Sequence, residues 1–252
     1  MKNKSKNRYI TTPRQAERTD KKTKTDFVSF ILFSENHGYR MKSHGPIPLL
    51  TVNGRTIIER QIDAIKAAFL NFEIIICSGF QTEKIVNFIK DKFKDVNVRV
   101  VENQVHYNSN CCESARLCLN NTVNNKVMLC NGNVILDPLH YSIIDTNQSC
   151  VIVQDDHLDD SFEIGAISAD KGLERLSLGI KQKYWVELIY LSNQEVIRDI
   201  YSIISNPEYK NRFIFEAVNE ILTKQKIEVK SNQYSPIYKV NNIKTLKKVQ
   251  NK

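Results

Sequence analysis

The chain has 252 residues, of which 41% are hydrophobic and 25% are charged, and its formal net charge is +8. These fractions are those of a folded globular protein, so a collagen-like, coiled-coil or wholly disordered chain is excluded. No apolar run approaches the ~18 residues that span a bilayer, and no apolar stretch follows the basic N-terminus as it does in a secretory signal, so we expect an intracellular (cytoplasmic) protein without a membrane partner.

Strand and helix patterns alternate along the chain. In chain order we predict a strand at 26–33, an extended piece at 49–52, a helix opening at 56–65, a strand at 72–77, a helix at 81–93, a strand at 96–101, a helix at 112–120, and strands at 126–130 and 151–153. A mostly extended region follows at 161–192, then helices at 194–205 and 212–224, strands at 227–230 and 237–240, and a last helix at 243–249.

This alternation predicts a single α/β domain over residues 27–249. Its central sheet should be mostly parallel, with helices on both faces. We interpret the extended region 161–192 as a small antiparallel insertion in that domain.

The positive charge is concentrated at the two ends. Residues 1–26 carry a net +6 and residues 239–252 a net +5, which leaves a net −3 for the body between them. A basic, polar segment such as residues 2–8 has no apolar area to bury, so alone it should be a flexible arm. Two interpretations stay open: a solvated leader without a partner, or an arm that orders on a polyanion or an acidic protein surface, with residues 239–252 as a second basic contact.

In an open parallel sheet, ligands bind beyond the carboxyl ends of the strands. Three loops occupy such ends, after Phe33, Cys77 and Cys130. The first loop runs from Glu35 to Arg40 and ends in a guanidinium whose fork suits oxyanions. Arg40 is therefore either a phosphate contact or a surface ion-pair residue.

Two consecutive segments have the pattern of a strand that runs into a loop, followed by a proline-containing stretch that leads to the start of a helix. Residues 31–41 are Ile-Leu-Phe-Ser-Glu-Asn-His-Gly-Tyr-Arg-Met, and residues 45–60 begin Gly-Pro-Ile-Pro-Leu-Leu. Further segments in the same order are 78–80, 110–114, 130–134, 215–219 and 237–246. Together they resemble the nucleotidyltransferase superfamily, in its sugar-phosphate and phosphocholine cytidylyltransferase branches, over residues 27–249. There the loop has the form Leu-Ala-Ala-Gly-x-Gly-Ser-Arg-Met and the following stretch is Pro-Lys-Pro-Leu-Leu.

The resemblance implies a GT-A, Rossmann-like fold and a reaction that joins a phosphorylated acceptor to the α-phosphate of a nucleoside triphosphate, with release of pyrophosphate. It implies that Arg40 contacts phosphate and that the metal positions are Asn133 and Asn241. The nucleotide-binding positions that it implies are Phe33, Ser34, Gly38, Gly79, Asn110, Ser114 and Gly132.

The sequence departs from this family where charge matters. Glu35 or Asn36 replaces a loop glycine, and Ile47 replaces the phosphate-binding lysine. Asn133 replaces the first metal-binding acid of the family, and the family's late Glu-x-Asp pair reads Lys239-Val240-Asn241 here, so an amide also replaces the second acid. Amides without carboxylate charge hold Mg²⁺ weakly. Asp137 and residues 155–156 are acids near strand ends that are either solvated or replacements.

The leading hypothesis is therefore a catalytically degenerate nucleotidyltransferase-like protein, which needs no cofactor. It would act as a binding or structural module, for example in a viral particle or a nucleoprotein complex. The alternative is an active, Mg²⁺-dependent nucleotidyltransferase that couples a CTP-like nucleotide to a phosphorylated sugar or choline-type acceptor. A nucleic-acid binder that reuses only the fold ranks last, because aromatic residues are not interleaved with the basic ones.

Overall fold

The computed structural model describes residues 24–38, 40–122, 124–155, 161–181 and 183–251. The strands are β1 (Lys24–Phe33), β2 (Thr51–Val52), β3 (Arg55–Thr56), β4 (Phe69–Ser78), β5 (Val98–Glu102), β6 (Val127–Asn131), β7 (Val134–Ile135), β8 (Cys150–Asp155), β9 (Ile164–Ala169), β10 (Gly172–Leu178), β11 (Lys183–Leu191), β12 (Glu228–Ser231) and β13 (Tyr238–Lys239). The α-helices are α1 (Ile57–Ala68), α2 (Thr82–Lys92), α3 (Cys111–Leu119), α4 (Gln194–Ile204), α5 (Ile214–Ile221) and α6 (Ile243–Gln250).

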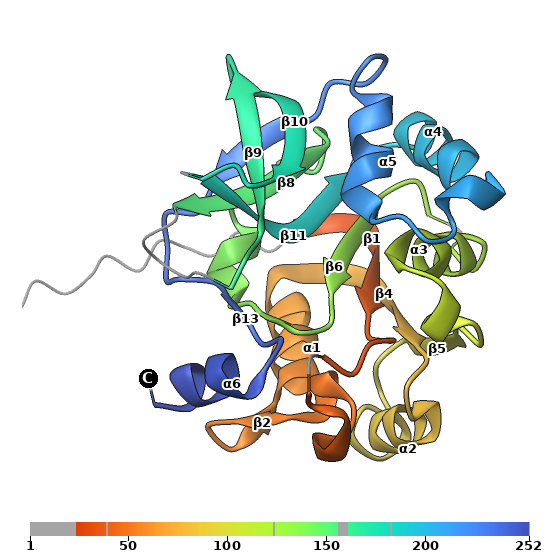
Figure 1. Ribbon diagram of the computed structural model, residues 1–252, viewed down its shortest axis with the longest axis vertical. Helices are drawn as coiled ribbons and strands as arrows, with labels where there is room; N and C mark the ends of the chain where they lie inside the picture. Colours follow the sequence, from red (N-terminus) through yellow and green to blue (C-terminus); the bar gives the residue numbers. More distant parts are fainter. Residues whose placement is uncertain (1–23, 39, 123, 156–160, 182, 252) are drawn as a thin grey trace, which may run out of the picture.

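One nine-stranded sheet runs through the molecule in the order β5-β4-β1-β6-β11-β8-β12-β10-β9 (Figure 1). The strands β5, β4, β1 and β6 are parallel to one another, and β12 is parallel to β8. Strand β11 is antiparallel to both β6 and β8, and β10 is antiparallel to β9 and β12. The sheet is therefore mixed, and the expectation of a mostly parallel sheet is not confirmed.

The extended region 161–192 is antiparallel, as predicted, but it is part of the main sheet. Its last strand, β11, lies between β6 and β8 in the middle of that sheet. Hydrophobicity could not give this direction, because a central strand buried on both faces has the same apolar pattern whichever way it runs. The structure also has strand β10 in this region, which was not predicted as a separate strand. A turn at Asp170 and Lys171, with φ values of 46° and 65°, separates it from β9.

Helices cover both faces of the sheet, as the sequence predicts. Alternate side chains of β1 point to opposite faces. Phe30 and Leu32 pack in one core with α1 and α2, whereas Ile31 and Phe33 pack in the other with α3, α4 and α5. The two apolar layers hold the carboxyl ends of β1, β4 and β6 at one edge.

The predicted Asn-Gly turn and helix start are both present. Asn53 and Gly54 have φ values of 48° and 79° and connect β2 to β3, which is the conformation of a type I′ hairpin turn. Thr56 then caps α1, because its side chain accepts a hydrogen bond from the Glu59 amide while the Glu59 carboxylate accepts one from the Thr56 amide.

The two basic ends differ in what the structure describes. Of the predicted arm, residues 1–23 lie outside the described residues, and residues 24–26 already belong to β1, where Asp26 pairs with Lys126 at 2.7 Å. Residues 239–251 are folded as the end of β13 and helix α6, which lies beside β2 (Figure 1). No helix in the described part of the chain is long and apolar enough to cross a membrane.

Candidate functional site

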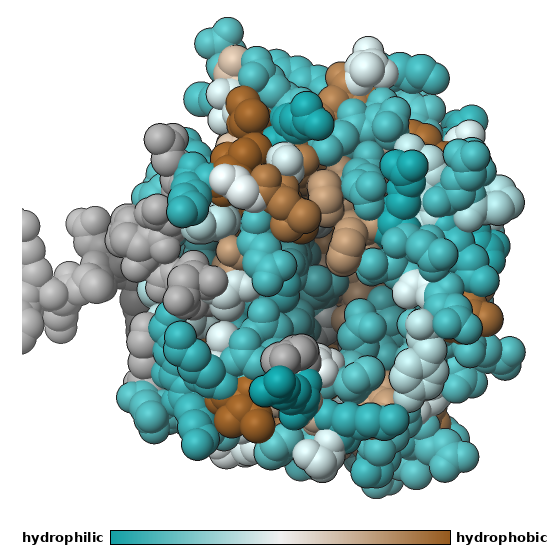
Figure 2. All heavy atoms as spheres, viewed as in Figure 1, coloured by the Kyte–Doolittle hydropathy of each residue, from teal (hydrophilic) through white to brown (hydrophobic). Residues whose placement is uncertain are grey.

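A cavity of about 250 Å³, here called the central cavity, opens at the carboxyl ends of β1 and β6. Figure 2 shows a hollow on this face, with hydrophobic side chains gathered above it and hydrophilic ones below. The polar residues of its wall are Ser34, Glu35, Asn36, Asn110, Asn131, Asn133, Glu163, Glu187 and Lys239. Its apolar wall includes Phe33, Ile47, Pro48, Cys111, Ile164, Leu178, Phe213 and Phe215.

The turn after β6 approaches the end of β1 closely. The Gly132 amide donates to the Phe33 carbonyl at 2.7 Å, and a Cβ at Gly132 would lie 2.8 Å from that carbonyl oxygen and against the Ser34 hydroxyl. Gln61 of α1 fixes the turn by donating from Nε2 to the carbonyls of Asn131 and Val134. Only glycine fits at this position.

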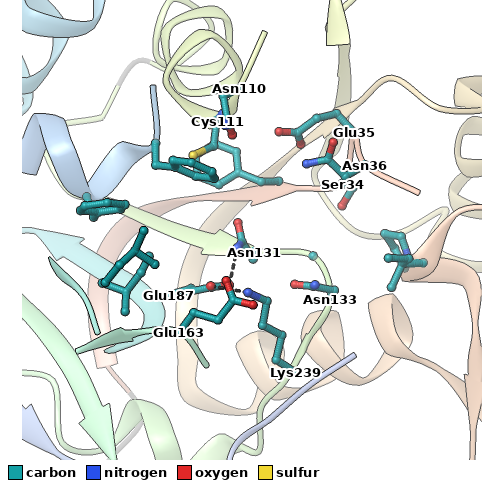
Figure 3. Close-up of a pocket in the computed structure, with 18 residues that line it drawn as sticks. Ser34, Glu35, Asn36, Asn110, Cys111, Asn131, Asn133, Glu163, Glu187 and Lys239 are labelled. Carbon is teal, nitrogen blue, oxygen red and sulfur yellow. Dashed lines mark hydrogen bonds and ion pairs between the residues drawn. The ribbon is translucent and has the colours of Figure 1, made fainter. Parts of the chain in front are cut away.

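The Asn133 side chain lines the cavity in this turn (Figure 3). Its Oδ1 atom is buried and has no hydrogen-bond partner, and its backbone carbonyl accepts from the Val240 amide at 2.9 Å. A buried acceptor without a donor costs free energy, because it would be hydrogen-bonded in water. This atom is therefore available to accept a hydrogen bond from a ligand.

A carboxylate enters the cavity from a distorted part of β11. The pairing of β11 with β8 shifts in register between Trp185 and Ile189, and Glu187 lies in this bulge with a left-handed φ of 60°. The Trp185 indole donates to the Leu188 carbonyl at 2.8 Å within the same bulge. Bulges re-aim side chains, and backbone strain in a non-glycine residue is concentrated at functional sites.

Glu187 has a partner on each oxygen. Its Oε1 lies 2.5 Å from the Lys239 ammonium, and its Oε2 accepts from Asn131 Nδ2 at 2.5 Å (Figure 3). The side chains of Glu187 and Lys239 are only 8% and 14% exposed. This pair joins β11 to β13 across the floor of the cavity.

A second carboxyl group, Glu35, enters from the opposite wall (Figure 3). The residue is 2% exposed. Its Oε1 accepts from the Ser114 hydroxyl at 2.8 Å, and Asn103 Nδ2 donates to that hydroxyl at 3.1 Å. The other oxygen, Oε2, is buried without a partner. Burial raises the pKa of the Glu35 carboxyl, more than the backbone and Ser114 hydrogen bonds lower it.

Five of the residues implied by the sequence come together at the cavity. These are Phe33, Ser34, Asn110, Gly132 and Asn133. Asn110 caps α3 by accepting from the Cys111 amide through Oδ1.

The other five implied residues do not line the central cavity. Gly38 is covered by Ile47, and Gly79 by the His106 ring, since a Cβ there would lie 2.6 Å from each neighbour. Ser114 touches the cavity only through Glu35. Arg40 is exposed, and Asn241 Oδ1 accepts from Asn242 Nδ2 at the start of α6.

Three charged residues of the site, Glu163, Glu187 and Lys239, were not predicted as site residues. Glu187 interrupts the apolar run 184–190, and a charge inside such a run is the one sequence signal that could have identified it. Lys239 was predicted as the first residue of the basic segment 239–252 and as a departure from the Glu-x-Asp pair, whereas in the structure its side chain is largely buried against Glu187.

The donors at the implied metal positions do not fit Mg²⁺. Position 133 offers an amide oxygen, the Asn241 amide oxygen accepts hydrogen bonds from Asn242 and Thr245 at the start of α6, and the Lys239 ammonium in the cavity wall pairs with Glu187. In the described ranges no three His, Cys, Asp or Glu side chains are grouped so that they could hold a metal ion.

Comparisons with known proteins agree on the architecture. The CTP:phosphocholine cytidylyltransferase of Streptococcus pneumoniae superposes with a TM-score of 0.75 at 17% identity, over 89% of this chain and 98% of that one. This chain has the nucleotidyltransferase fold.

Two further structures extend the likeness. The inositol-1-phosphate CTP transferase of T. maritima gives a TM-score of 0.70 at 13% identity, over 88% of this chain and 96% of its own. A UDP-glucose pyrophosphorylase complexed with UDP-glucose gives 0.69 at 10% identity, over 90% and 98%. No protein-family model and no curated protein matches the sequence. The resemblance predicted from the sequence is thus confirmed for the fold.

Proposed function

We propose that this nucleotidyltransferase-fold protein binds a small molecule in the central cavity and does not carry out Mg²⁺-dependent nucleotidyl transfer. The observation that carries the proposal is the ion pair between Lys239 and Glu187 at 2.5 Å on the cavity floor. A fixed ammonium there neutralises the carboxylate that a divalent ion would need, and it repels that ion.

The retained cavity supports a binding role. Its walls bring together polar groups from β6, β11, β13 and the loop after β1, and three of its oxygen atoms, on Ser34, Glu35 and Asn133, are buried without partners. Buried polar groups of this kind normally have partners, so their concentration in one cavity favours a bound ligand. We propose a binding module on these grounds, and a role in a larger assembly follows only if the basic arm finds a partner.

Pyrophosphate release tests the proposal directly. The wild-type protein should release no pyrophosphate from any of the four nucleoside triphosphates with Mg²⁺ and phosphorylated sugar or choline acceptors. The triple variant Asn133→Asp, Lys239→Glu, Asn241→Asp restores carboxylates at the three positions and is the matched positive control. It should gain binding of Mn²⁺, followed by electron paramagnetic resonance, which the wild type lacks. Mg²⁺-dependent release by the wild type would overturn the proposal.

One observation favours an active enzyme as the second candidate. Glu163 lies on the same wall as Glu187, so two carboxylates face the cavity together (Figure 3). If Lys239 moved aside, these two oxygen donors would be a rearranged site for Mg²⁺. This candidate requires wild-type turnover that falls at least about a hundredfold in Glu163→Gln, as expected when a metal ligand is lost.

A further inference from the structure

Negative groups outnumber positive ones around the central cavity. The described residues of its wall include two carboxylates, on Glu163 and Glu187, the buried carboxyl group of Glu35, whose pKa is raised by burial, and one ammonium, on Lys239. That ammonium is already paired with Glu187. A ligand that carries phosphates would bring more negative charge to a wall that has no unpaired cation among these residues.

Three oxygen atoms of cavity-lining side chains are buried without a partner: Ser34 Oγ, Glu35 Oε2 and Asn133 Oδ1. The Ser34 hydroxyl can donate as well as accept, whereas the Asn133 amide oxygen and an ionised Glu35 only accept. Glu35 is 2% exposed, so water does not satisfy it from the surface. In Figure 3 the Glu35 and Asn133 side chains lie on opposite sides of the opening. A molecule placed between them would satisfy both through hydroxyl or amino groups.

Part of the cavity wall is apolar. Phe213 and Phe215 line it with their rings stacked at 5.9 Å, and Leu178 is exposed at its edge. A smaller cavity of about 30 Å³ shares these phenylalanines and is also lined by Trp185, Ile189, Asn131 and Glu187. The two phenylalanine rings suit an apolar or planar group.

The loop after β1 adds no positive charge inside the cavity. Ile47 is buried, lines the wall and covers Gly38. An apolar side chain there gives a phosphate oxygen no partner and takes up space beside the loop backbone.

Resting on the proposed binding function, we propose that the central cavity takes an unphosphorylated small molecule, neutral or cationic, whose hydroxyl or amino donors meet Glu35 and Asn133. Its apolar or planar part packs against Phe213 and Phe215. The cavity thus selects against the anionic groups that a nucleotidyltransferase would bind.

Matched compounds that differ only in phosphate test this selection. Calorimetric titrations without Mg²⁺ would compare cytidine, CMP and CTP, adenosine, AMP and ATP, and glucosamine with glucosamine 6-phosphate. We expect at least one unphosphorylated compound to bind about tenfold more tightly than its phosphorylated form, a difference of about 1.4 kcal/mol. Affinity that rises with the number of phosphates overturns the inference, and so does the absence of binding by every unphosphorylated compound.

A charge reversal on the cavity wall gives an independent readout. Glu163 is exposed, so Glu163→Lys should leave folding intact, as thermal unfolding would verify. This variant should shift the preference toward the phosphorylated member of each set by at least about fivefold. Glu174→Lys is the control, because Glu174 is an exposed acid on β10 outside the central cavity. Equal shifts in Glu163→Lys and Glu174→Lys would show that the preference follows the overall charge of the protein, which would overturn the inference that the cavity wall selects the ligand.

These results separate the two proposals. Wild-type pyrophosphate release with Mg²⁺ would refute the proposed function. A wild-type protein that releases no pyrophosphate but binds phosphorylated compounds more tightly than unphosphorylated ones would refute only the proposed class of ligand.

Discussion

The substitution Lys239→Met tests whether the ion pair on the cavity floor holds the site together. Methionine keeps the apolar stem of the lysine and removes the ammonium, so Glu187 becomes a buried carboxylate without its cation. Glu187 and Lys239 are 8% and 14% exposed, so water compensates little. Breaking a buried pair by removing one partner costs about 3–5 kcal/mol. Asn131 still donates to the other Glu187 oxygen, so we expect the low end, about 3 kcal/mol.

Urea unfolding followed by circular dichroism would measure this loss. With a slope of about 3 kcal/mol/M for a chain of this size, the midpoint should fall by about 1 M. The double variant Lys239→Met, Glu187→Gln removes the orphaned charge and should recover most of the loss. Lys92→Met is the control, because Lys92 is 59% exposed and its 3.6 Å pair with Glu59 should contribute less than about 0.5 kcal/mol. A loss below about 1 kcal/mol, or an equal loss in the single and double variants, would refute the reasoning.

Three further predictions address the rest of the site. Because the folded-state pKa of Glu35 is raised, the stability linked to its protonation is present at low pH and is lost as pH rises through that pKa. The melting temperature of Glu35→Gln should therefore rise relative to that of the wild type between pH 4 and pH 8. A difference that stays constant over this range would contradict the prediction. Gly132→Ala should destabilise by about 2–3 kcal/mol through overpacking against the Phe33 carbonyl and Ser34, with partial recovery in a Ser34→Ala background; an unchanged urea midpoint would show that the turn can relax. Deletion of residues 1–23, which leaves β1 complete, should abolish salt-sensitive binding to heparin beads used as a model polyanion, and retention by the shortened chain would argue against an arm that contacts polyanions.

The sequence predicted the elements well because their signals are local. The apolar run of β1, the Asn-Gly turn before Thr56 and the stripe of α1 each depend on neighbouring residues alone. Strand direction is not local, since it is fixed by which strands pair, and β11 runs antiparallel through the centre of the sheet without any change in its apolar composition. That is why the helices were predicted correctly and the parallel character of the sheet was not.

The site was predicted in part for the same reason. Ser34, Gly132 and Asn133 follow predicted strands directly, so their place at the cavity follows from the topology. Glu187 reaches the cavity because the backbone of β11 turns to a left-handed φ within a bulge, and nothing in the residues around it requires that conformation. The charge of Glu187 inside an apolar run could have marked that residue, but its place at the cavity and its pairing with Lys239 could not be assigned without the fold.

The Lys239–Glu187 pair also explains why single substitutions should not create a metal site. Asn133→Asp alone would place a new carboxylate beside the existing ammonium, which offers it an internal partner in place of a metal ion. Lys239→Glu alone would leave Glu187 and the new acid to repel each other while Asn133 still offers only an amide. Metal affinity should therefore appear only when the ammonium is removed and carboxylates are added together, so the effects of the three substitutions on Mn²⁺ binding should be strongly non-additive. On the proposed function, the fixed Lys239 ammonium stands in place of a divalent ion, and because Glu187 already neutralises it, it has little charge left to attract a phosphate.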